Sequence, residues 1–166
     1  MTVNIGQIQR LLELLGHSPG KIDGIWGPKS QAALDGALRS LGQSGDFWAE
    51  IRHFQRQEFR CKCGGQFCDG FPAEPKEKMV RIADQIREHF GRPARVISGL
   101  RCKTWNGLQG GVVGSQHMYG EACDLCVEGV GWEELLAYTK TLPGVRYAYH
   151  IEGSNNVHFD IPASDR

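Results

Sequence analysis

The chain has 166 residues, of which 40% are hydrophobic and 23% are charged, and its 19 basic and 19 acidic side chains give a net charge of zero. This length suits one ordinary domain plus a small appendage, with enough apolar residues for a real core. The basic residues form no long run, so neither nucleic acid nor an anionic membrane is an expected partner. No apolar segment approaches the length of a membrane span, and we expect a monomer.

The N-terminal forty residues predict a helical hairpin. Residues 5–15 carry Ile and Leu at helical spacing, with Asn4 as a candidate N-cap. A turn at 23–24 is followed by Pro28, which suits the first turn of a second helix. The expected inward positions of that helix are Ala33, Leu34, Ala37, Leu38 and Leu41. The first ten residues lack a charged start followed by an apolar core, so the sequence predicts no secretory signal.

The remainder predicts a domain of mixed helices and strands. Asp46 is a candidate cap for a linker helix that ends near Gln57, and a turn-rich, cysteine-rich segment follows at 59–71. Expected helices span 72–90 and 132–142, and expected strands span 95–98, 122–127, 147–151 and 156–161. This order predicts an α+β fold, in which helices pack on a small, mainly antiparallel sheet with a metal cleft, preceded by a small helical subdomain.

Three residues form a candidate metal site. His117 and Asp124 lie seven residues apart, on a loop and on the apolar strand that follows it. His158 lies on a later strand whose alternation separates it from the apolar face. Two imidazole nitrogens and one carboxylate oxygen leave a fourth position open on Zn²⁺, which is the pattern of catalytic rather than structural zinc sites.

Four groups of residues carry a resemblance to a known family. They are Ser98-Gly99-x-Arg101, Asn106 with Gly110-Gly111, Ser115-x-His117-x-x-Gly120-x-Ala122-x-Asp124, and Val157-His158-x-Asp160. They resemble the zinc D-alanyl-D-alanine metallopeptidases, which include bacterial D,D-carboxypeptidases, vancomycin-resistance dipeptidases, phage endolysins and the distantly related hedgehog domain. The resemblance implies one catalytic Zn²⁺ and hydrolysis of peptidoglycan stem peptides, either at D-Ala-D-Ala or at an internal bond.

The N-terminal pattern IQRLLELLG…DGIWGPKSQAAL resembles the helical peptidoglycan-binding repeat that accompanies many wall hydrolases. The expected organisation is therefore a binding-like subdomain at 1–42, a linker helix at 43–58 and a metallopeptidase domain at 59–166. Together with the absence of a predicted signal, the resemblance favours a phage or prophage lysin, made in the bacterial cytoplasm and acting at the cell wall.

Hydrolysis also needs a general base. Many relatives carry an acid three residues before the last zinc His, but that position here is Asn155. Glu152, six residues before His158 as in hedgehog domains, is the expected base, and Asp160 is expected to orient a ligand or to pair with an Arg. His150 is a candidate for stabilising the oxyanion or a simple strand residue.

Arg101 is expected to hold a substrate carboxylate or the oxyanion, because its guanidinium fork suits either. Ser115 is a weaker candidate for a hydrogen bond to substrate. The second class of function is a catalytically inactive, zinc-containing wall-binding or interaction module, which the missing acid at Asn155 keeps open.

Six cysteines complete the candidate residues. Cys61, Cys63, Cys68 and Cys102 predict, in order of preference, a disulfide to Cys102, free thiols or a second zinc held by four thiolates. Cys123 and Cys126 are expected to be small core residues.

Overall fold

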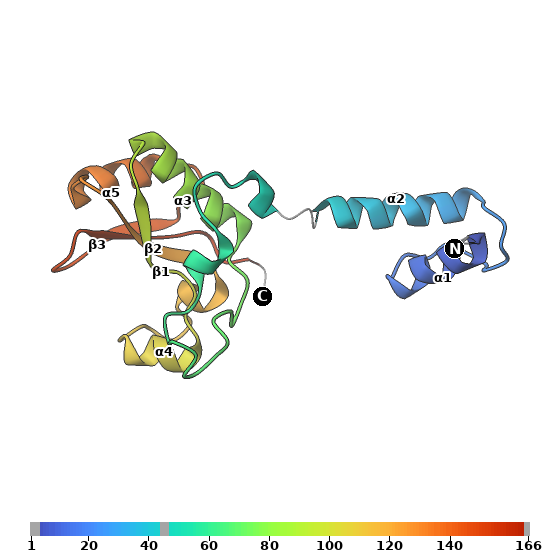
Figure 1. Cartoon of the computed structure of the whole chain (residues 1–166), viewed down its shortest axis with the longest axis horizontal. Coiled ribbons are helices and arrows are strands. Elements are labelled where there is room, and N and C mark those ends of the chain that lie inside the picture. The colour runs from blue at the N-terminus through green and yellow to red at the C-terminus, as the bar shows by residue number, and fades with distance from the viewer. Residues whose placement is uncertain (1–3, 44–46, 165–166) are drawn as a thin grey trace. The chain divides into compact units, whose positions relative to one another are not determined.

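The computed structural model describes residues 4–43 and 47–164, with only the backbone described for 38–43. The chain divides into two compact units, residues 1–47 and 48–166, which are considered separately below. The α+β fold expected from the sequence is confirmed (Figure 1). None of the helices in the described part of the chain is long and apolar enough to cross a membrane.

The first unit is the predicted helical hairpin, formed by α1 (Ile5–Leu14) and α2 (Pro28–Gln43). Asn4 caps α1 as expected, and its side chain accepts a hydrogen bond from the Gln7 N–H. The buried amide of Gln9 ties α1 to the turn before α2, because it donates to the Ile25 carbonyl and accepts from the Gly24 N–H. Leu12, Ala33 and Ala37 form the small core. The expected inward positions Leu38 and Leu41 lie outside the described side chains.

The expected linker helix is replaced by two short 3₁₀ helices, η1 (Phe47–Glu50) and η2 (Arg56–Phe59), and its expected cap Asp46 lies outside the described residues. The carboxylate of Asp84 accepts hydrogen bonds from the backbone N–H groups of Arg52 (3.2 Å) and His53 (2.9 Å). Because a helix would use these N–H groups internally, this contact holds the segment between η1 and η2 out of helical geometry.

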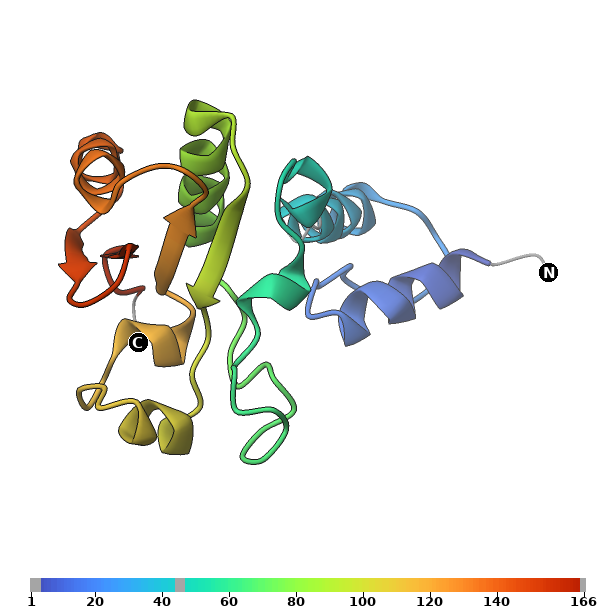
Figure 2. The same cartoon turned by 60° about the vertical axis from the view of Figure 1, so that its left-hand side comes forward.

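The second unit is built on a four-stranded antiparallel sheet in the order β1-β2-β4-β3. The strands are β1 (Ala94–Ser98), β2 (Ala122–Val127), β3 (Tyr147–Ile151) and β4 (Asn156–Asp160). Helices α3 (Glu77–Phe90) and α5 (Trp132–Thr141) cover one face, while α4 (Lys103–Leu108) and η3 (Gln116–Tyr119) lie on the other side in Figure 1. Figure 2 shows the same arrangement from a second direction.

Strand alternation separates the core from the polar side of the sheet. Leu125, Val157 and Phe159 are fully buried on the side of α3 and α5. Asp124 and His158 project to the opposite side, where they are directly paired across β2 and β4. The sheet therefore presents a polar face away from its two long helices.

The helices differ from the sequence expectation at the start of α3 and in two short elements. Helix α3 begins at Glu77 rather than Pro72, because Pro75 disfavours helical geometry at the residue before it and the Lys76 N–H bonds the Gly120 carbonyl. Helix α4 and η3 were not predicted, since each spans fewer than two turns and carries no readable apolar period.

Candidate metal centre and cleft

Three elements bring together the residues of the candidate metal site. Asp124 in β2 faces His158 in β4, and His117 lies in η3, which Gly120 ends in the left-handed conformation before the chain enters β2. One ligand atom from each of the three side chains lies within 4.8 Å of the others. All three residues are buried, with 3%, 4% and 6% of His117, Asp124 and His158 exposed.

Hydrogen bonds aim the ligand atoms at a common point. His117 Nδ1 lies 2.7 Å from the Gly99 carbonyl oxygen, which can only accept a hydrogen bond, so Nδ1 is the donor of this contact and Nε2 is the ring nitrogen directed at the cluster. That Nε2 lies 3.2 Å from Asp124 Oδ1 and 3.3 Å from His158 Nδ1. His158 Nδ1 lies 2.7 Å from the same Oδ1. Two nitrogens and one carboxylate oxygen with this convergence fit a zinc ion.

Arg101 and Asp124 form a largely buried ion pair beside this cluster. The Arg101 guanidinium donates from Nη2 to Asp124 Oδ2 (2.6 Å) and from Nε to Ser98 Oγ (2.7 Å). Burial alone would raise the pKa of the Asp124 carboxyl, but its close polar contacts with the His117 and His158 rings outweigh burial and hold that pKa well below its usual range. Asp124 therefore stays ionised, as a metal ligand must.

Asp160 is paired with an arginine, as the sequence analysis expected of it. Arg146 donates from Nε (2.8 Å) and Nη2 (2.6 Å) to its two carboxylate oxygens. Asp160 Oδ2 also lies 3.7 Å from His158 Nε2, which is longer than a hydrogen bond. The charge of the Asp160 carboxylate is therefore neutralised by Arg146, and this ion pair lies next to His158, a candidate metal ligand.

Tyr149 is a site residue that the sequence analysis did not single out. Its ring stacks on the imidazole of His158, with centroids 4.5 Å apart. Burial, with the nearby charge of Asp124, raises the pKa of the Tyr149 phenol, so the hydroxyl remains a hydrogen-bond donor. The antiparallel register of β3 and β4, which pairs Tyr149 with His158, brings it there.

The cluster opens into a cleft of about 650 Å³. Its lining includes Arg101, Tyr149 and Ser115, together with the Gly110-Gly111 loop. A Cβ at Gly111 would lie 2.2 Å from Asn106 Oδ1, so this glycine allows the loop to pack against α4. The volume lies within the range of small-molecule sites, about 300–1,000 Å³.

Two expected catalytic residues lie outside the cleft lining. Glu152 is exposed in the turn between β3 and β4. His150 pairs across the sheet with Val157, on the face opposite His158, where its ring stacks on Trp132 at 4.0 Å and its Nε2 lies 2.7 Å from the Ser154 carbonyl. The structure thus joins His150 to α5 rather than to the metal cluster.

The model of the Peptidase M15 family matches residues 52–160, which span the whole sheet and every residue of the metal cluster. No curated protein matches the chain. Peptidases of this family are zinc-dependent, in agreement with the donor set of His117, Asp124 and His158. The chain belongs to the Peptidase M15 family of metallopeptidases.

Proposed function

We propose that this metallopeptidase hydrolyses the stem peptides of bacterial peptidoglycan with one zinc ion held by His117, Asp124 and His158. The observation that carries the proposal is the convergence of these three ligand atoms within 4.8 Å, at a cleft large enough for a short peptide. The sequence resemblance to D-alanyl-D-alanine peptidases supports the choice of substrate.

A zinc ion in this position would supply Lewis acidity for the attack of water on a peptide carbonyl. Arg101 holds Asp124 by its second oxygen and also lines the cleft, so it orients a ligand while presenting positive charge to substrate. The Tyr149 hydroxyl, protonated at neutral pH, is available as a donor to a carbonyl oxygen in the cleft.

The proposed general base is Glu152. Among the described residues that line the cleft, carboxylates come from Asp124 and Asp160. Asp124 belongs to the metal cluster. Both carboxylate oxygens of Asp160 accept hydrogen bonds from Arg146, so this carboxylate is not free to act as the base. Glu152 directly follows Ile151, which lines the cleft, and its exposed carboxylate lies in a hairpin turn at the end of β3.

The test is incubation of the zinc-loaded protein with purified muropeptides, followed by mass spectrometry. Loss of a terminal alanine identifies a D,D-carboxypeptidase, whereas cleavage within the stem or cross-link identifies an endopeptidase. Glu152→Gln should lose turnover while retaining the zinc ion of this site, and His117→Ala should lose turnover together with that zinc ion. Glu134→Gln, which removes an exposed carboxylate of α5 away from the cleft, is the matched control and should keep full turnover. An unchanged rate in Glu152→Gln would exclude this base, and unchanged muropeptides across wall types would exclude the peptidoglycan peptidase.

A second candidate function is a zinc-containing wall-binding module without catalysis. Asn155, at the position of the acid found in many relatives, has a structural role: its Oδ1 accepts from the Trp132 N–H (2.8 Å) and its Nδ2 donates to the Val130 carbonyl (2.8 Å). These bonds attach the β3–β4 hairpin to the start of α5. Binding to insoluble peptidoglycan without release of products would favour this candidate.

The first unit is proposed to bind the wall, and the site of action is proposed to be the cell wall. Several apolar side chains of this unit are exposed, namely Leu11, Leu14, Leu15 and Ile25.

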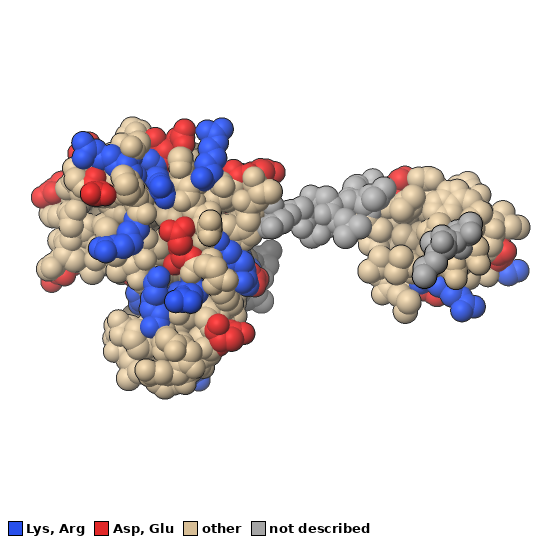
Figure 3. Space-filling view, in the orientation of Figure 1, with Lys and Arg blue, Asp and Glu red and all other residues tan. Residues whose placement is uncertain are grey.

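On the face of the second unit shown in Figure 3, basic and acidic side chains are interspersed, so this face offers no continuous basic surface for a polyanion.

A further inference from the structure

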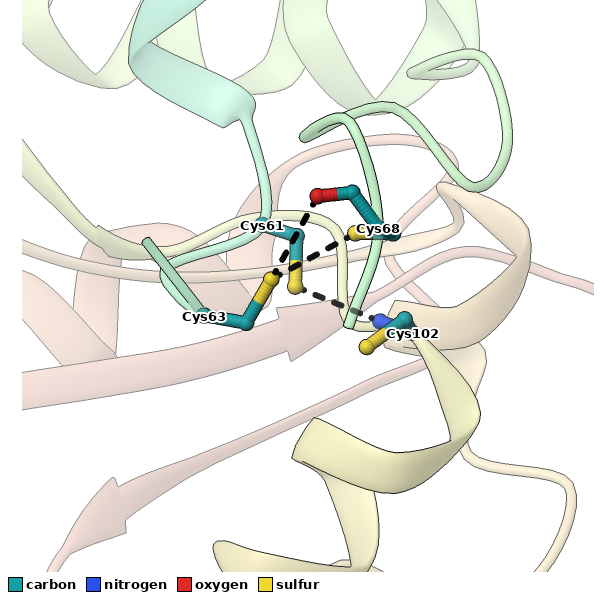
Figure 4. A group of neighbouring side chains, drawn as sticks. All are labelled: Cys61, Cys63, Cys68 and Cys102. Carbon is teal, nitrogen blue, oxygen red and sulfur yellow. Dashed lines mark hydrogen bonds between the residues drawn. The ribbon is translucent and has the colours of Figure 1, made fainter. Parts of the chain in front are cut away.

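A second cluster of metal-ligating side chains lies outside the cleft. Cys61, Cys63 and Cys68 come from the segment between η2 and α3, and Cys102 comes from the N-cap of α4. Their sulfur atoms all lie within 4.8 Å of one another. Figure 4 shows the four side chains pointing toward a common centre. The segment 60–76 contains no helix or strand, so side-chain and loop contacts, those of this cluster among them, hold it in the fold.

The spacing of the sulfur atoms suits a shared cation. Four thiolates around tetrahedral zinc, at Zn–S distances of about 2.3 Å, are separated by about 3.8 Å. Cys63 Sγ and Cys68 Sγ are 3.5 Å apart, close to that separation and far beyond the covalent distance of about 2.05 Å in a disulfide. All four cysteines are free in the structure, with no disulfide between them.

Backbone N–H groups around the cluster donate hydrogen bonds to two of its sulfur atoms. The Cys102 N–H donates to Cys61 Sγ (3.3 Å), and the Trp105 N–H donates to Cys102 Sγ (3.4 Å). Such N–H···S bonds are stronger when the sulfur carries negative charge. Gly64 and Gly65, both at positive φ, form the turn after Cys63 that allows the chain to return to Cys68.

The cluster is also shielded from solvent. Cys61, Cys63 and Cys102 are 3%, 2% and 7% exposed and pack with Leu100, while Phe71 and Trp105 are partly buried against them. Four soft thiolate ligands favour zinc over hard cations, and a site they fill leaves no position for water or substrate. We propose that Cys61, Cys63, Cys68 and Cys102 bind a second, structural zinc ion.

This site would brace the wall of the catalytic cleft. Cys102 directly follows Arg101, whose backbone N–H bonds the His117 carbonyl (3.0 Å). The Leu100 N–H bonds the Phe59 carbonyl (2.7 Å), and the Gly99 carbonyl accepts from His117 Nδ1. A metal that joins Cys61 to Cys102 therefore fixes the segment that orients His117 and Arg101.

The proposal is tested by elemental analysis of the full chain, purified under reducing conditions. Two zinc ions per chain are expected for the unaltered protein. His117→Ala should retain one zinc ion, Cys63→Ser should also retain one with a lower Tm, and the double variant should retain none. Cys126→Ser, a cysteine outside the cluster, is the matched control and should retain two.

Cobalt substitution covers the case in which Cys63→Ser fails to fold. The variant His117→Ala/Asp124→Asn keeps all six cysteines, and with Co²⁺ it should show the thiolate-to-cobalt charge-transfer band of a four-sulfur tetrahedral site. One zinc per unaltered chain with alkylatable thiols, a mass lower by two or four hydrogens from disulfides, or iron in place of zinc would each overturn the proposal. Failure to cleave muropeptides would leave these readouts unchanged, so the two proposals fail separately.

Discussion

The ring of Tyr149 covers one side of His158, a proposed metal ligand, and also lines the cleft. Tyr149→Ala should weaken zinc binding by about 10-fold, because packing around a ligand fixes its orientation. Tyr149→Phe should bind zinc normally, since the stacked ring remains. Zinc affinity is measured by competition with a chromogenic chelator. Tyr147→Ala, on the same face of β3, is the control; equal losses at both positions would indicate a general effect on the strand.

Arg101 has two possible roles that one experiment separates. Its two hydrogen bonds, to Asp124 and Ser98, require the guanidinium fork. Arg101→Lys should lower kcat/KM by roughly 10²-fold, the scale of losing one oriented donor at a reacting centre. If Arg101 holds the terminal carboxylate, KM should rise for a free-acid peptide but not for its C-terminal amide. Equal changes for both peptides would indicate that Arg101 acts on Asp124 or on the reacting carbonyl.

At the scale of elements, the segment after β1 passes close to a second backbone near the site. A Cβ at Gly99 would lie 2.4 Å from the Phe59 carbonyl oxygen and 2.7 Å from its Cα. Gly99→Ala should therefore destabilise the protein by roughly 1–3 kcal/mol, because both backbones must shift. The shift would also displace the carbonyl that orients His117, so zinc affinity should fall as well.

The matched control is Gly107→Ala in α4, where the added Cβ would meet nothing within 4 Å. This change should be neutral or stabilising by up to about 1 kcal/mol, since alanine favours a helix. Both variants are compared by urea denaturation and zinc content. A Gly99→Ala protein as stable as Gly107→Ala would contradict the close approach.

Local sequence pattern predicted the regular elements well, because their period is encoded in adjacent residues. Strands β2, β3 and β4 and helix α5 lie within a residue of where alternation or helical spacing placed them, and α3 ends at Phe90 as expected although it begins later. The segment that contains η1 and η2 was not predicted, since its conformation depends on Asp84, which lies about thirty residues further along the chain.

At the scale of the whole molecule, the division into two units makes a prediction about function. The fragment 48–166 contains the sheet, the metal cluster and the four-cysteine cluster. It should fold alone, bind two zinc ions and cleave soluble muropeptides at the rate of the full chain. Its binding to insoluble peptidoglycan should fall, because the proposed wall-binding unit is gone. A sedimentation assay measures this; unchanged sedimentation would exclude that role for residues 1–47.

The sequence by itself was enough to name the three proposed zinc ligands, because His117, Asp124 and His158 lie within motifs that resemble those of a known peptidase family. It also determined the α+β class, since strand and helix periods are local properties. The pairing of Asp160 with an arginine was expected, although the partner Arg146 was not named.

Only the tertiary structure decided which side chains face the cleft. His150 and Tyr149 are neighbours in sequence, and strand alternation predicts that they lie on opposite faces of the sheet. The register of β3 on β4 decides which face each takes: Tyr149 packs on His158, whereas His150 packs on α5. The four cysteines likewise left disulfide, thiol and metal open, because their meaning depends on a contact between Cys102 and a segment some forty residues away. Long-range pairing, not local pattern, sets these distances, and the chemistry of both clusters depends on them.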